Sequence, residues 1–430
     1  MSKIAIRRED LSYERRAPLG PSHIEPLSQS GIQVLVEPAE QRIFLDGDYA
    51  EAGATITTNL NAAPTIMGLK EIATELLLPD KTYLFFSHTI KGQARNMPML
   101  KRLMELNATL IDYEPITDEA GKRIVFFGRF AGLAGMIDTF WALGKRMEYE
   151  GKEGPFKNIR QATDYQSLDQ ARADLRQLGK EIQEGGLPEE LSPLIIGIAG
   201  DGNVARGAKQ MLAELPSTEI DTDTLLNHPP TQAGVYHIVL DIEELVQPRN
   251  AVGGVDREEY YRRPEAFRST FAERYLPHLH LVLNCAYWDE RYPRLITRND
   301  LRALYSTPSP PRLKVIGDLS CDVNGSVEAT VKSTQPDNPI YVFNPETGEE
   351  RDGAAGDGPV VLAVYNLPSE LPREASIAFG NALLPLIPSL ANYDRTAPLA
   401  NCGLPPALQR ATILYRGELT PQYRYLEEYL

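Results

Sequence analysis

The stretch "SPLIIGIAGDGNVARGAKQMLAELP" (192–216) decides the fold that the sequence predicts. Its apolar run 194–200 predicts a buried β-strand, and the residues after the glycines have a helical pattern. Between them stands Gly200-x-Gly202-x-x-Ala205, a G-x-G-x-x-G/A pattern in the strand–turn–helix context that it requires. Gly200 would allow the tight turn, Gly202 would let the backbone approach a pyrophosphate, and Ala205 would permit close helix–strand packing.

The beginning of the following helix, at Asn203 and Val204, would offer free N–H groups and a partial positive charge to phosphates. We therefore predict a dinucleotide site at this loop. The alternative interpretation is a βα turn that is rich in glycine for structural reasons only.

The choice of dinucleotide stays open in the sequence. An acid about 20 residues after the motif holds a ribose 2′-hydroxyl in such sites. Glu219 and Asp221 stand there, and we take Asp221 as the cofactor-binding candidate, which would favour NAD. Arg206 and Lys209 in the following helix could instead reach the 2′-phosphate of NADP. All four could also be solvated surface charges.

Along the rest of the chain, apolar runs alternate with helical patterns, which is typical of an α/β fold. Several runs are continuously apolar, as in parallel sheets covered on both faces. We expect strands at 3–8, 32–38, 65–70, 82–88, 108–114, 123–128, 194–200, 237–242, 279–288, 313–320 and 360–367, and helices at 96–107, 131–151, 167–184 and 374–391.

The fold class that follows is α/β, with two Rossmann-like domains, mostly parallel sheets and an interdomain cleft. We expect a discontinuous substrate domain formed by residues 1–135 and 336–430. Connecting helices would cover 136–192, and the dinucleotide-binding domain would cover 193–335.

Composition excludes some classes of function. The chain has 44 lysines and arginines against 59 aspartates and glutamates, a formal charge of −15, which argues against a nucleic-acid partner. Cys285, Cys321 and Cys402 show neither a disulfide framework nor metal-ligand spacing. The N-terminus lacks the apolar core of a signal peptide, and no window approaches a membrane span. We therefore expect a cytoplasmic protein without a bound metal or a membrane partner.

Two successive strands of the N-terminal part end on groups that can carry protons. "TIMGLKEI" ends on Lys70 and Glu71, and "YLFFSHTIK" brings His88 to the end of its strand. Ligands of open α/β sheets bind at the carboxyl ends of strands, so neighbouring strands would bring Lys70 and His88 together. A partly desolvated lysine there would have a lowered pKa suited to base catalysis. The alternative is that both are ordinary surface residues.

An arginine pair follows the first strand, Arg15 and Arg16 in "YERRAPLGPSHI" (13–24). A guanidinium is suited to bind a carboxylate through two parallel hydrogen bonds. A solvated loop is the alternative interpretation.

The segments "GLKEI", "FFSHTIKGQARNMPML", "GRFAGLAGMI", "GDGNVARGA", "LVLNCAYWDERYPRLITRNDL" and "GDLSCDVNGSVEAT" occur in the order seen in lysine–2-oxoglutarate reductases. The chain resembles this family, which forms the N-terminal half of bifunctional aminoadipic semialdehyde synthases. It is similar also to fungal saccharopine dehydrogenase (lysine-forming) and, more distantly, to alanine dehydrogenase and transhydrogenase.

The resemblance implies a reaction in which the ε-amine of lysine condenses with 2-oxoglutarate, and the imine is reduced to saccharopine by hydride from a nicotinamide. It implies that Lys70 accepts the proton of the amine and that His88 is the acid–base group for water loss. Arg16 would bind a carboxylate. By the same resemblance, Glu71, Glu114 and Arg123 belong to the substrate region, and Asp318 lies at the nicotinamide end.

The resemblance leaves several alternatives. The cofactor is expected to be NADPH, with NADH as the alternative. The partners are lysine, 2-oxoglutarate and saccharopine, and the oligomeric state is not indicated. A rival enzyme would deaminate a small amino acid in the manner of alanine dehydrogenase. A rival of another class is a non-catalytic dinucleotide-binding regulator.

Overall fold

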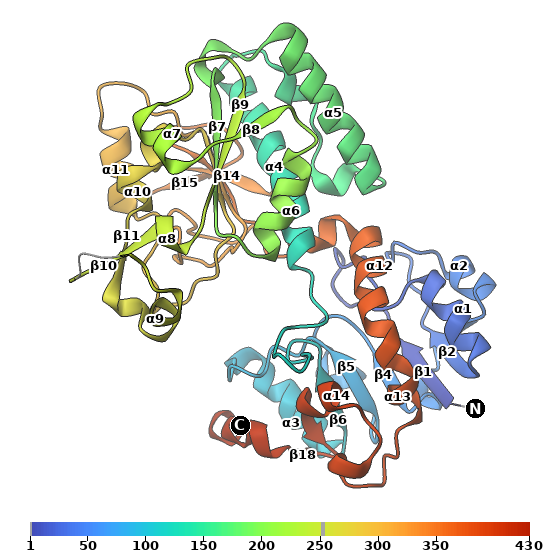
Figure 1. Ribbon diagram of the computed structural model, residues 1–430. Coiled ribbons are helices and arrows are strands. Elements are labelled where there is room, and N and C mark those ends of the chain that lie inside the picture. Colours follow the sequence, from blue (N-terminus) through green and yellow to red (C-terminus); the bar gives the residue numbers. More distant parts are fainter. Residues whose placement is uncertain (1, 251–253) are drawn as a thin grey trace. The chain divides into compact units, whose positions relative to one another are not determined.

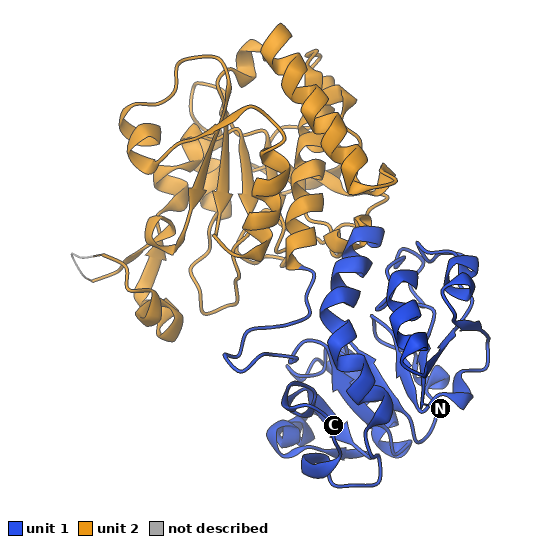
Figure 2. Cartoon of the chain, turned by 45° about the vertical axis from the view of Figure 1, so that its right-hand side comes forward, with its two compact units in different colours: residues 1–127, 372–430 blue, residues 128–371 orange. Residues whose placement is uncertain are grey.

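The computed structural model of the chain describes residues 2–250 and 254–430, which form two compact units (Figure 2). Unit 1 consists of residues 1–127 and 372–430, and unit 2 consists of residues 128–371. The expected boundaries differ from these. Residues 336–371 belong to unit 2 because their strands extend its sheet, and residues 136–192 are also part of unit 2.

Unit 1 contains an eight-stranded sheet in the order β18-β17-β6-β5-β4-β1-β2-β3 (Figure 1). Strands β1 to β6 run parallel to one another, and β17 pairs antiparallel with β6. The strands are β1 (Ser2–Ile6), β2 (Ile32–Val36), β3 (Thr55–Ile56), β4 (Thr65–Met67), β5 (Thr82–Phe85), β6 (Thr109–Asp112), β17 (Thr412–Tyr415) and β18 (Glu418–Leu419).

The helices of unit 1 bury the apolar faces of this sheet. They are α1 (Pro21–Gln29), α2 (Asp46–Glu51), α3 (Met97–Glu105), α12 (Pro372–Leu383), α13 (Ile387–Asn392) and α14 (Pro406–Arg410). The stretch Pro372–Asn392 has a mean hydropathy of 1.2 and is long and apolar enough to cross a membrane by length and composition alone. The expectation that no window approaches a span is therefore wrong by this criterion. A core helix meets the same criterion, and Phe379, Leu383 and Leu390 belong to the core of unit 1.

Unit 2 contains a second eight-stranded sheet in the order β15-β14-β16-β13-β12-β7-β9-β8. Its strands from β16 to β8 are parallel, and β14 and β15 complete it in antiparallel fashion. The strands are β7 (Leu194–Ala199), β8 (Ser217–Glu219), β9 (Val235–Leu240), β12 (Leu281–Asn284), β13 (Val315–Asp318), β14 (Ile340–Phe343), β15 (Glu350–Asp352) and β16 (Val360–Leu362). A separate hairpin pairs β10 (Val246–Pro248) with β11 (Phe267–Ser269).

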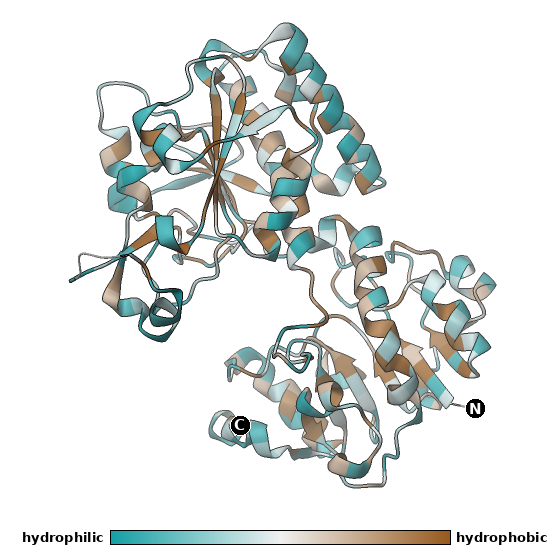
Figure 3. Cartoon of the chain, in the orientation of Figure 1, coloured by the Kyte–Doolittle hydropathy of each residue, from teal (hydrophilic) through white to brown (hydrophobic). Residues whose placement is uncertain are grey.

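Helices of unit 2 lie on both sides of its sheet, with α4 to α6 on one side and α10 and α11 on the other (Figure 1). The strands between them are among the most apolar segments of the chain (Figure 3). The helices are α4 (Gly128–Tyr149), α5 (Leu168–Gly185), α6 (Asn203–Leu212), α7 (Thr222–Asn227), α8 (Ile242–Leu245), α9 (Arg257–Arg262), α10 (Phe271–Arg274) and α11 (Arg298–Tyr305).

Most expected strands and helices form within a few residues of their predicted bounds, but the strand expected at 123–128 does not. That segment has only a single bridge between Thr117 and Arg123 and then enters α4. The strand beside β6 is instead β17 from residues 392–430, where the sequence shows little pattern, and β18 forms the edge of the sheet beyond it.

Two glycines set the packing of α4 against α6 within unit 2. A Cβ at Gly132 would lie 1.8 Å from the carbonyl oxygen of Val204, and a Cβ at Gly207 would lie 2.0 Å from that of Arg129. Backbone atoms cannot yield to such contacts as a flexible side chain can. The two helices therefore approach closely only because neither position has a side chain.

We predict that Gly207→Ala lowers the free energy of unfolding by about 1–3 kcal/mol, the usual cost of overpacking. Gly185→Ala is the matched control, because a Cβ there meets open space at the end of α5. It should leave stability unchanged or raise it by up to about 1 kcal/mol, the helix preference of alanine over glycine. Chemical denaturation of the two variants measures the difference, and equal stabilities would contradict the close-packing explanation.

Candidate functional site

The carboxyl ends of β4 and β5 meet at one edge of the sheet of unit 1. These strands pair in parallel, with Met67 beside Leu84, so the turns that follow them are neighbours. His88 Nδ1 lies 2.7 Å from Glu71 Oε1, and Glu71 follows Lys70 directly. The structure thus brings the predicted histidine to the turn that contains the predicted lysine.

His88 is held in an unusual backbone conformation. Its φ of +48° lies in the left-handed region, which costs a non-glycine residue about 1–2 kcal/mol. The side chain of Asn96 donates a hydrogen bond of 2.9 Å to the His88 carbonyl oxygen, and the ring of Phe86 stacks on the imidazole. These contacts and the bond to Glu71 stabilise a conformation that aims the imidazole at its carboxylate partner.

Lys70 lies partly buried among charges of both signs. Desolvation by burial is the largest effect that lowers the pKa of its amine, and the charge of Arg16 lowers it further. Three carboxylates, Glu14, Glu71 and Glu9, act in the opposite direction, but the net shift is downward. A lowered amine pKa is what a lysine needs to exchange protons close to neutral pH, as the sequence predicts.

Arg16 is 3 % exposed and forms a two-point ion pair with Glu14, with contacts of 2.7 Å from Nε and 2.6 Å from Nη2. Its guanidinium also lies 4.2 Å from the ring centre of Phe127. Burial by itself would raise the pKa of Glu14, but the charge and hydrogen bonds of Arg16 outweigh burial and lower it. The arginine is therefore fixed in position, with a carboxylate in the bidentate geometry that a substrate carboxyl would use.

The remaining substrate candidates form two further pairs. Burial would raise the pKa of Glu71, yet the hydrogen bond and charge of His88 lower it. Glu114 follows β6 and forms an ion pair of 2.5 Å with the half-exposed Arg123. Their roles toward a substrate remain predictions.

Asp112, at the end of β6, is a site residue that the sequence analysis missed. Its fully buried carboxylate accepts hydrogen bonds from the backbone N–H groups of Ser87, at 2.8 Å, and Glu114, at 2.7 Å. The Ser87 hydroxyl also donates to it. Asp112 thereby joins the segment before His88 to the segment that carries Glu114. Only the adjacency of β5 and β6 reveals this function, because Asp112 in the sequence is one polar residue at a strand end.

In unit 2, the glycine loop has the features that a pyrophosphate requires. Gly200 has a φ of +102°, and a Cβ there would lie 3.1 Å from the backbone nitrogen of Ala286. Gly202 is the N-cap of α6, and a Cβ there would meet no atom within 4 Å. Ala205 is buried in α6. The open backbone at Gly202 and the helix N-terminus at Asn203 and Val204 fit a dinucleotide phosphate.

Asp221 lies after the edge strand β8, and β9 separates β8 from β7. Its carboxylate caps α7 by accepting a hydrogen bond from the Thr224 N–H at 2.8 Å. Asp241 follows β9, the strand that pairs with β7, and in this type of fold the ribose-binding acid follows that neighbouring strand. The inserted β8 and α7 put Asp241 at 241 − 200 = 41 residues after Gly200, which is why counting about 20 residues missed it.

Arg257, on α9, connects the glycine loop to Asp241. Its guanidinium lies 3.3 Å from Asp201, in the loop itself, and forms a second ion pair with Asp241. Lys209, one of the sequence candidates for a 2′-phosphate, instead pairs with Glu219 at 3.2 Å, whereas Arg206 is exposed at the surface of α6. Arg257 therefore places a positive charge beside the acid expected to face the ribose.

Asp318 ends β13 and is fully buried. It accepts hydrogen bonds from Asn284 Nδ2 at 2.9 Å, Ser320 Oγ at 2.7 Å and Thr330 Oγ1 at 2.5 Å. Burial raises the pKa of this carboxyl despite these donors. The three bonds fix the ends of β12 and β13, and a contact with a nicotinamide remains a prediction.

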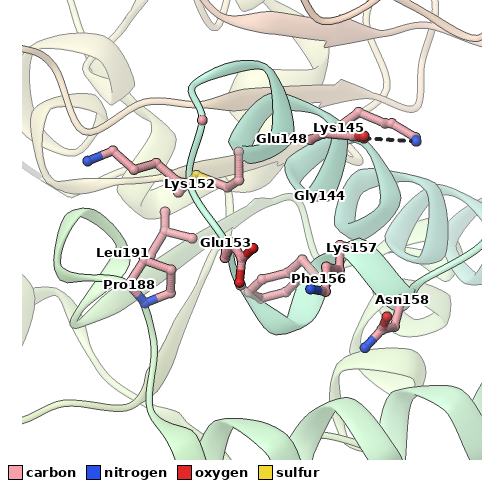
Figure 4. A pocket seen from close by; sticks show the side chains of 13 residues that line it. Gly144, Lys145, Glu148, Lys152, Glu153, Phe156, Lys157, Asn158, Pro188 and Leu191 are labelled. Atoms are coloured by element: carbon pink, nitrogen blue, oxygen red, sulfur yellow. Dashed lines mark hydrogen bonds and ion pairs between the residues drawn. The ribbon is translucent and has the colours of Figure 1, made fainter.

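A separate cavity of about 540 Å³ lies in unit 2 at the C-terminal end of α4 (Figure 4). Lys145, Lys152 and Lys157 line it, but Lys145 pairs with Glu148 and Lys152 pairs with Glu190. None of the predicted site residues lines this cavity. Within residues 2–250 and 254–430, no group of three or more His, Cys, Asp or Glu side chains is arranged to hold a metal ion.

Comparison with known proteins gives matches for both units. The N-terminal domain of the alanine dehydrogenase/PNT family matches residues 5–134, and the C-terminal domain of that family matches residues 197–422. The chain belongs to the alanine dehydrogenase/PNT family. This membership confirms the expected class, a nicotinamide-dependent dehydrogenase of the alanine dehydrogenase and saccharopine dehydrogenase type.

Two kinds of curated relative are similar to this family member. The α-aminoadipic semialdehyde synthase of Arabidopsis thaliana is 35 % identical over 433 residues, covering 96 % of the chain and 40 % of that protein. The mitochondrial enzyme of that name from Bos taurus is 33 % identical and is covered over 47 % of its length. The chain thus spans under half the length of these relatives. A saccharopine dehydrogenase (NAD+, L-lysine-forming) of Emericella nidulans is 29 % identical, covering 91 % of the chain and 93 % of that protein.

Solved structures confirm the expected α/β fold class. An L-alanine dehydrogenase matches with a TM-score of 0.61 at 18 % identity, covering 99 % of both chains. A transhydrogenase from Sinorhizobium meliloti matches with a TM-score of 0.57 at 14 % identity. At these identities the likeness concerns the fold.

We predict that Asp112→Asn lowers the free energy of unfolding by about 1–3 kcal/mol, because one backbone N–H would then face an amide donor. Asp118→Asn is the matched control, since this exposed aspartate accepts hydrogen bonds from the N–H groups of Ala120 and Lys122. Its effect should stay within about 0.5 kcal/mol. Urea denaturation followed by circular dichroism compares the two, and similar losses would show that burial of Asp112 is not decisive.

Proposed function

We propose that the chain is a lysine–2-oxoglutarate reductase, which joins L-lysine and 2-oxoglutarate reversibly to form saccharopine with a nicotinamide cofactor. The observation that carries this proposal is the cluster at the edge of the unit 1 sheet. There a lysine of lowered pKa adjoins a histidine–carboxylate pair and a buried arginine. The names of the curated relatives support the same reaction.

The reaction demands proton transfers that this cluster can perform. An amine attacks a ketone only in its neutral form, so a base must remove its proton, and Lys70 with its lowered pKa is suited to that step. The carbinolamine that forms must lose water, which requires an acid, and His88 held by Glu71 is suited to donate that proton.

The carboxylates of the substrates need a fixed cation for orientation. Arg16 already holds the Glu14 carboxylate through two hydrogen bonds, and a substrate carboxylate would share or replace that contact. The bound nicotinamide would supply the hydride that reduces the imine, and Gly200, Gly202 and the start of α6 would hold its pyrophosphate.

For the cofactor we propose NADPH, with NADH as the alternative. In a site that binds NAD, the acid binds the ribose hydroxyls. Here the acid in that position, Asp241, is paired with Arg257, which neutralises its charge. The guanidinium of Arg257 is suited to a 2′-phosphate, which it could bind at the ribose end of the loop. The separated cysteines support a cytoplasmic location, which stays a prediction.

The reaction is tested by mixing lysine, 2-oxoglutarate and NADPH or NADH and following the absorbance of the reduced nicotinamide. We expect lysine-dependent oxidation, and Lys70→Met and His88→Gln should each reduce turnover at least about ten- to a hundred-fold. Nucleotide binding should stay intact in both variants. Lys91→Met, a change at an exposed lysine of the same loop, should retain wild-type turnover.

Two outcomes would reject the reaction. The first is that neither NADPH nor NADH is oxidised in the presence of lysine and 2-oxoglutarate, whereas pyruvate and ammonia are turned over. This result would identify an alanine-dehydrogenase-like enzyme. Nucleotide binding without turnover of either substrate set would identify a non-catalytic regulator.

The cofactor choice is tested by fluorescence titration of NADPH and NADH. We expect tighter binding of NADPH, and Arg257→Ala should weaken NADPH binding at least about ten-fold because a charge-assisted contact is lost. NADH binding should change little. Arg268→Ala, which changes an arginine of β11 paired with Glu273, is the matched control. An effect from Arg206→Ala instead would assign the 2′-phosphate to α6.

A further inference from the structure

A buried carboxylate, Glu9, lies beneath the candidate base. Glu9 follows β1, the strand next to β4, and is 6 % exposed. Its Oε1 accepts a hydrogen bond of 2.7 Å from the N–H of Leu69, and its Oε2 accepts one of 3.0 Å from the N–H of Lys70. The Glu9 side chain therefore holds the peptide groups of both Leu69 and Lys70, which follow β4.

No pattern in the sequence distinguishes Glu9, which is one acid in the charged segment "RRED". The two hydrogen bonds connect residues that are 60 and 61 positions apart in the chain, and they form only because β1 and β4 are neighbours. Nothing in the proposed reaction requires Glu9 to contact a substrate. Its connection to the reaction runs through Lys70.

We propose that Glu9 is a positioning residue that fixes the Lys70 peptide at the sheet edge and adjusts the protonation of the Lys70 amine. This inference rests on the proposed function insofar as that function makes Lys70 the proton acceptor. The two hydrogen bonds of Glu9 support its role in positioning the Lys70 peptide. The charges around Lys70 support its effect on the protonation of the amine.

The charges around Glu9 come from three segments. Arg7 precedes it and forms an ion pair with Asp10 at 2.8 Å, and Glu14 follows it in the same loop. Lys70 faces it from the end of β4, and Tyr113 faces it from the end of β6. Burial raises the pKa of Glu9 to about 7, Arg7 opposes that shift, and Glu14 adds to it.

Two consequences for Lys70 follow from a carboxyl that ionises near neutral pH. The ionised form accepts both backbone N–H groups strongly, whereas protonation weakens one acceptor and so loosens the hold on the Lys70 peptide. The ionised form also favours the ammonium form of Lys70, because a nearby negative charge raises an amine pKa. The protons of Glu9 and Lys70 therefore leave in two coupled steps.

Glu9→Gln keeps the size of the side chain but removes the charge, so the remaining influences on Lys70 are burial, Arg16, Glu14 and Glu71. The pKa of Lys70 should fall, and more of the amine should be neutral at pH 7. A merely structural role for Glu9 would change stability and leave this titration where it is.

The experiment measures the titration of Lys70 directly in the full chain. Brief acetylation with acetic anhydride at a series of pH values, read by mass spectrometry of the Lys70 peptide, reports the neutral fraction of the amine. We expect Glu9→Gln to increase labelling at pH 7 about three- to ten-fold, which corresponds to a shift of half to one pH unit. The acidic limb of the kcat/KM profile should move to lower pH by the same amount.

Glu37→Gln is the matched control. Glu37 also accepts a backbone hydrogen bond at this sheet edge, from the N–H of Arg8 at 2.9 Å, but it is not among the main charges that act on Lys70. Its labelling curve should coincide with that of the wild type. A Glu9→Gln curve that also coincides with the wild-type curve would overturn the proposal.

The wild-type protein provides a test that does not depend on the folding of any variant. Its Lys70 labelling curve should show an additional inflection near pH 7, from Glu9, and a single-step curve would overturn the proposal. Labelling needs no substrate. Absence of turnover with lysine and 2-oxoglutarate would therefore reject the proposed function while leaving this inference supported or refuted by the curve alone.

Discussion

Two buried carboxylates that accept backbone N–H groups hold the candidate site together. Glu9 binds the peptides that lead into Lys70, and Asp112 binds those of Ser87 and Glu114. Glu9, which follows β1, holds the end of the neighbouring strand β4, and Asp112 on β6 holds the end of the neighbouring strand β5 as well as the residue after its own strand. A parallel sheet leaves such N–H groups unpaired where its strands end, and an unpaired buried donor costs about 1–3 kcal/mol. The same bonds that remove this cost also fix the backbone of the proton-handling residues.

This constraint explains why the site can contain strained and partly desolvated groups. The left-handed backbone of His88 is held by two side chains, because Asp112 binds the preceding residue Ser87 and Asn96 binds the His88 carbonyl oxygen. Burial and the charge of Arg16 lower the pKa of Lys70, while the hydrogen bond to Glu9 holds its peptide in place. Such rigid support allows the amine of Lys70 and the imidazole of His88 to stay in the geometry that catalysis requires.

Much of this arrangement was accessible from the sequence. The apolar runs identified the parallel strands, and the rule that ligands bind at their carboxyl ends identified Lys70, Glu71 and His88 as neighbours. The glycine loop was recognised from its strand–helix context. These inferences succeed because they depend on local patterns and on the order of adjacent strands.

What was missed depends on contacts between distant segments. Glu9 and Asp112 look like ordinary acids until β1 is placed beside β4 and β5 beside β6. Asp241 was passed over because β8 and α7 lengthen the connection between two strands that are neighbours in space. The apolar residues of 123–128 predict a strand, whereas the strand that pairs with β6 is β17, from residues 412–415. The sequence alone contains no signal for these pairings.

The insertion of the continuous unit 2 between the two parts of unit 1 has a consequence for biosynthesis. The pair of Ile111 and Thr412, which joins β6 to β17, spans 412 − 111 = 301 residues. On the ribosome, β6 therefore remains an open sheet edge until residue 412 has emerged, while unit 2 can fold as soon as residue 371 is free. An unpaired edge strand invites association with other chains, so the nascent N-terminal part is where a chaperone would be needed most.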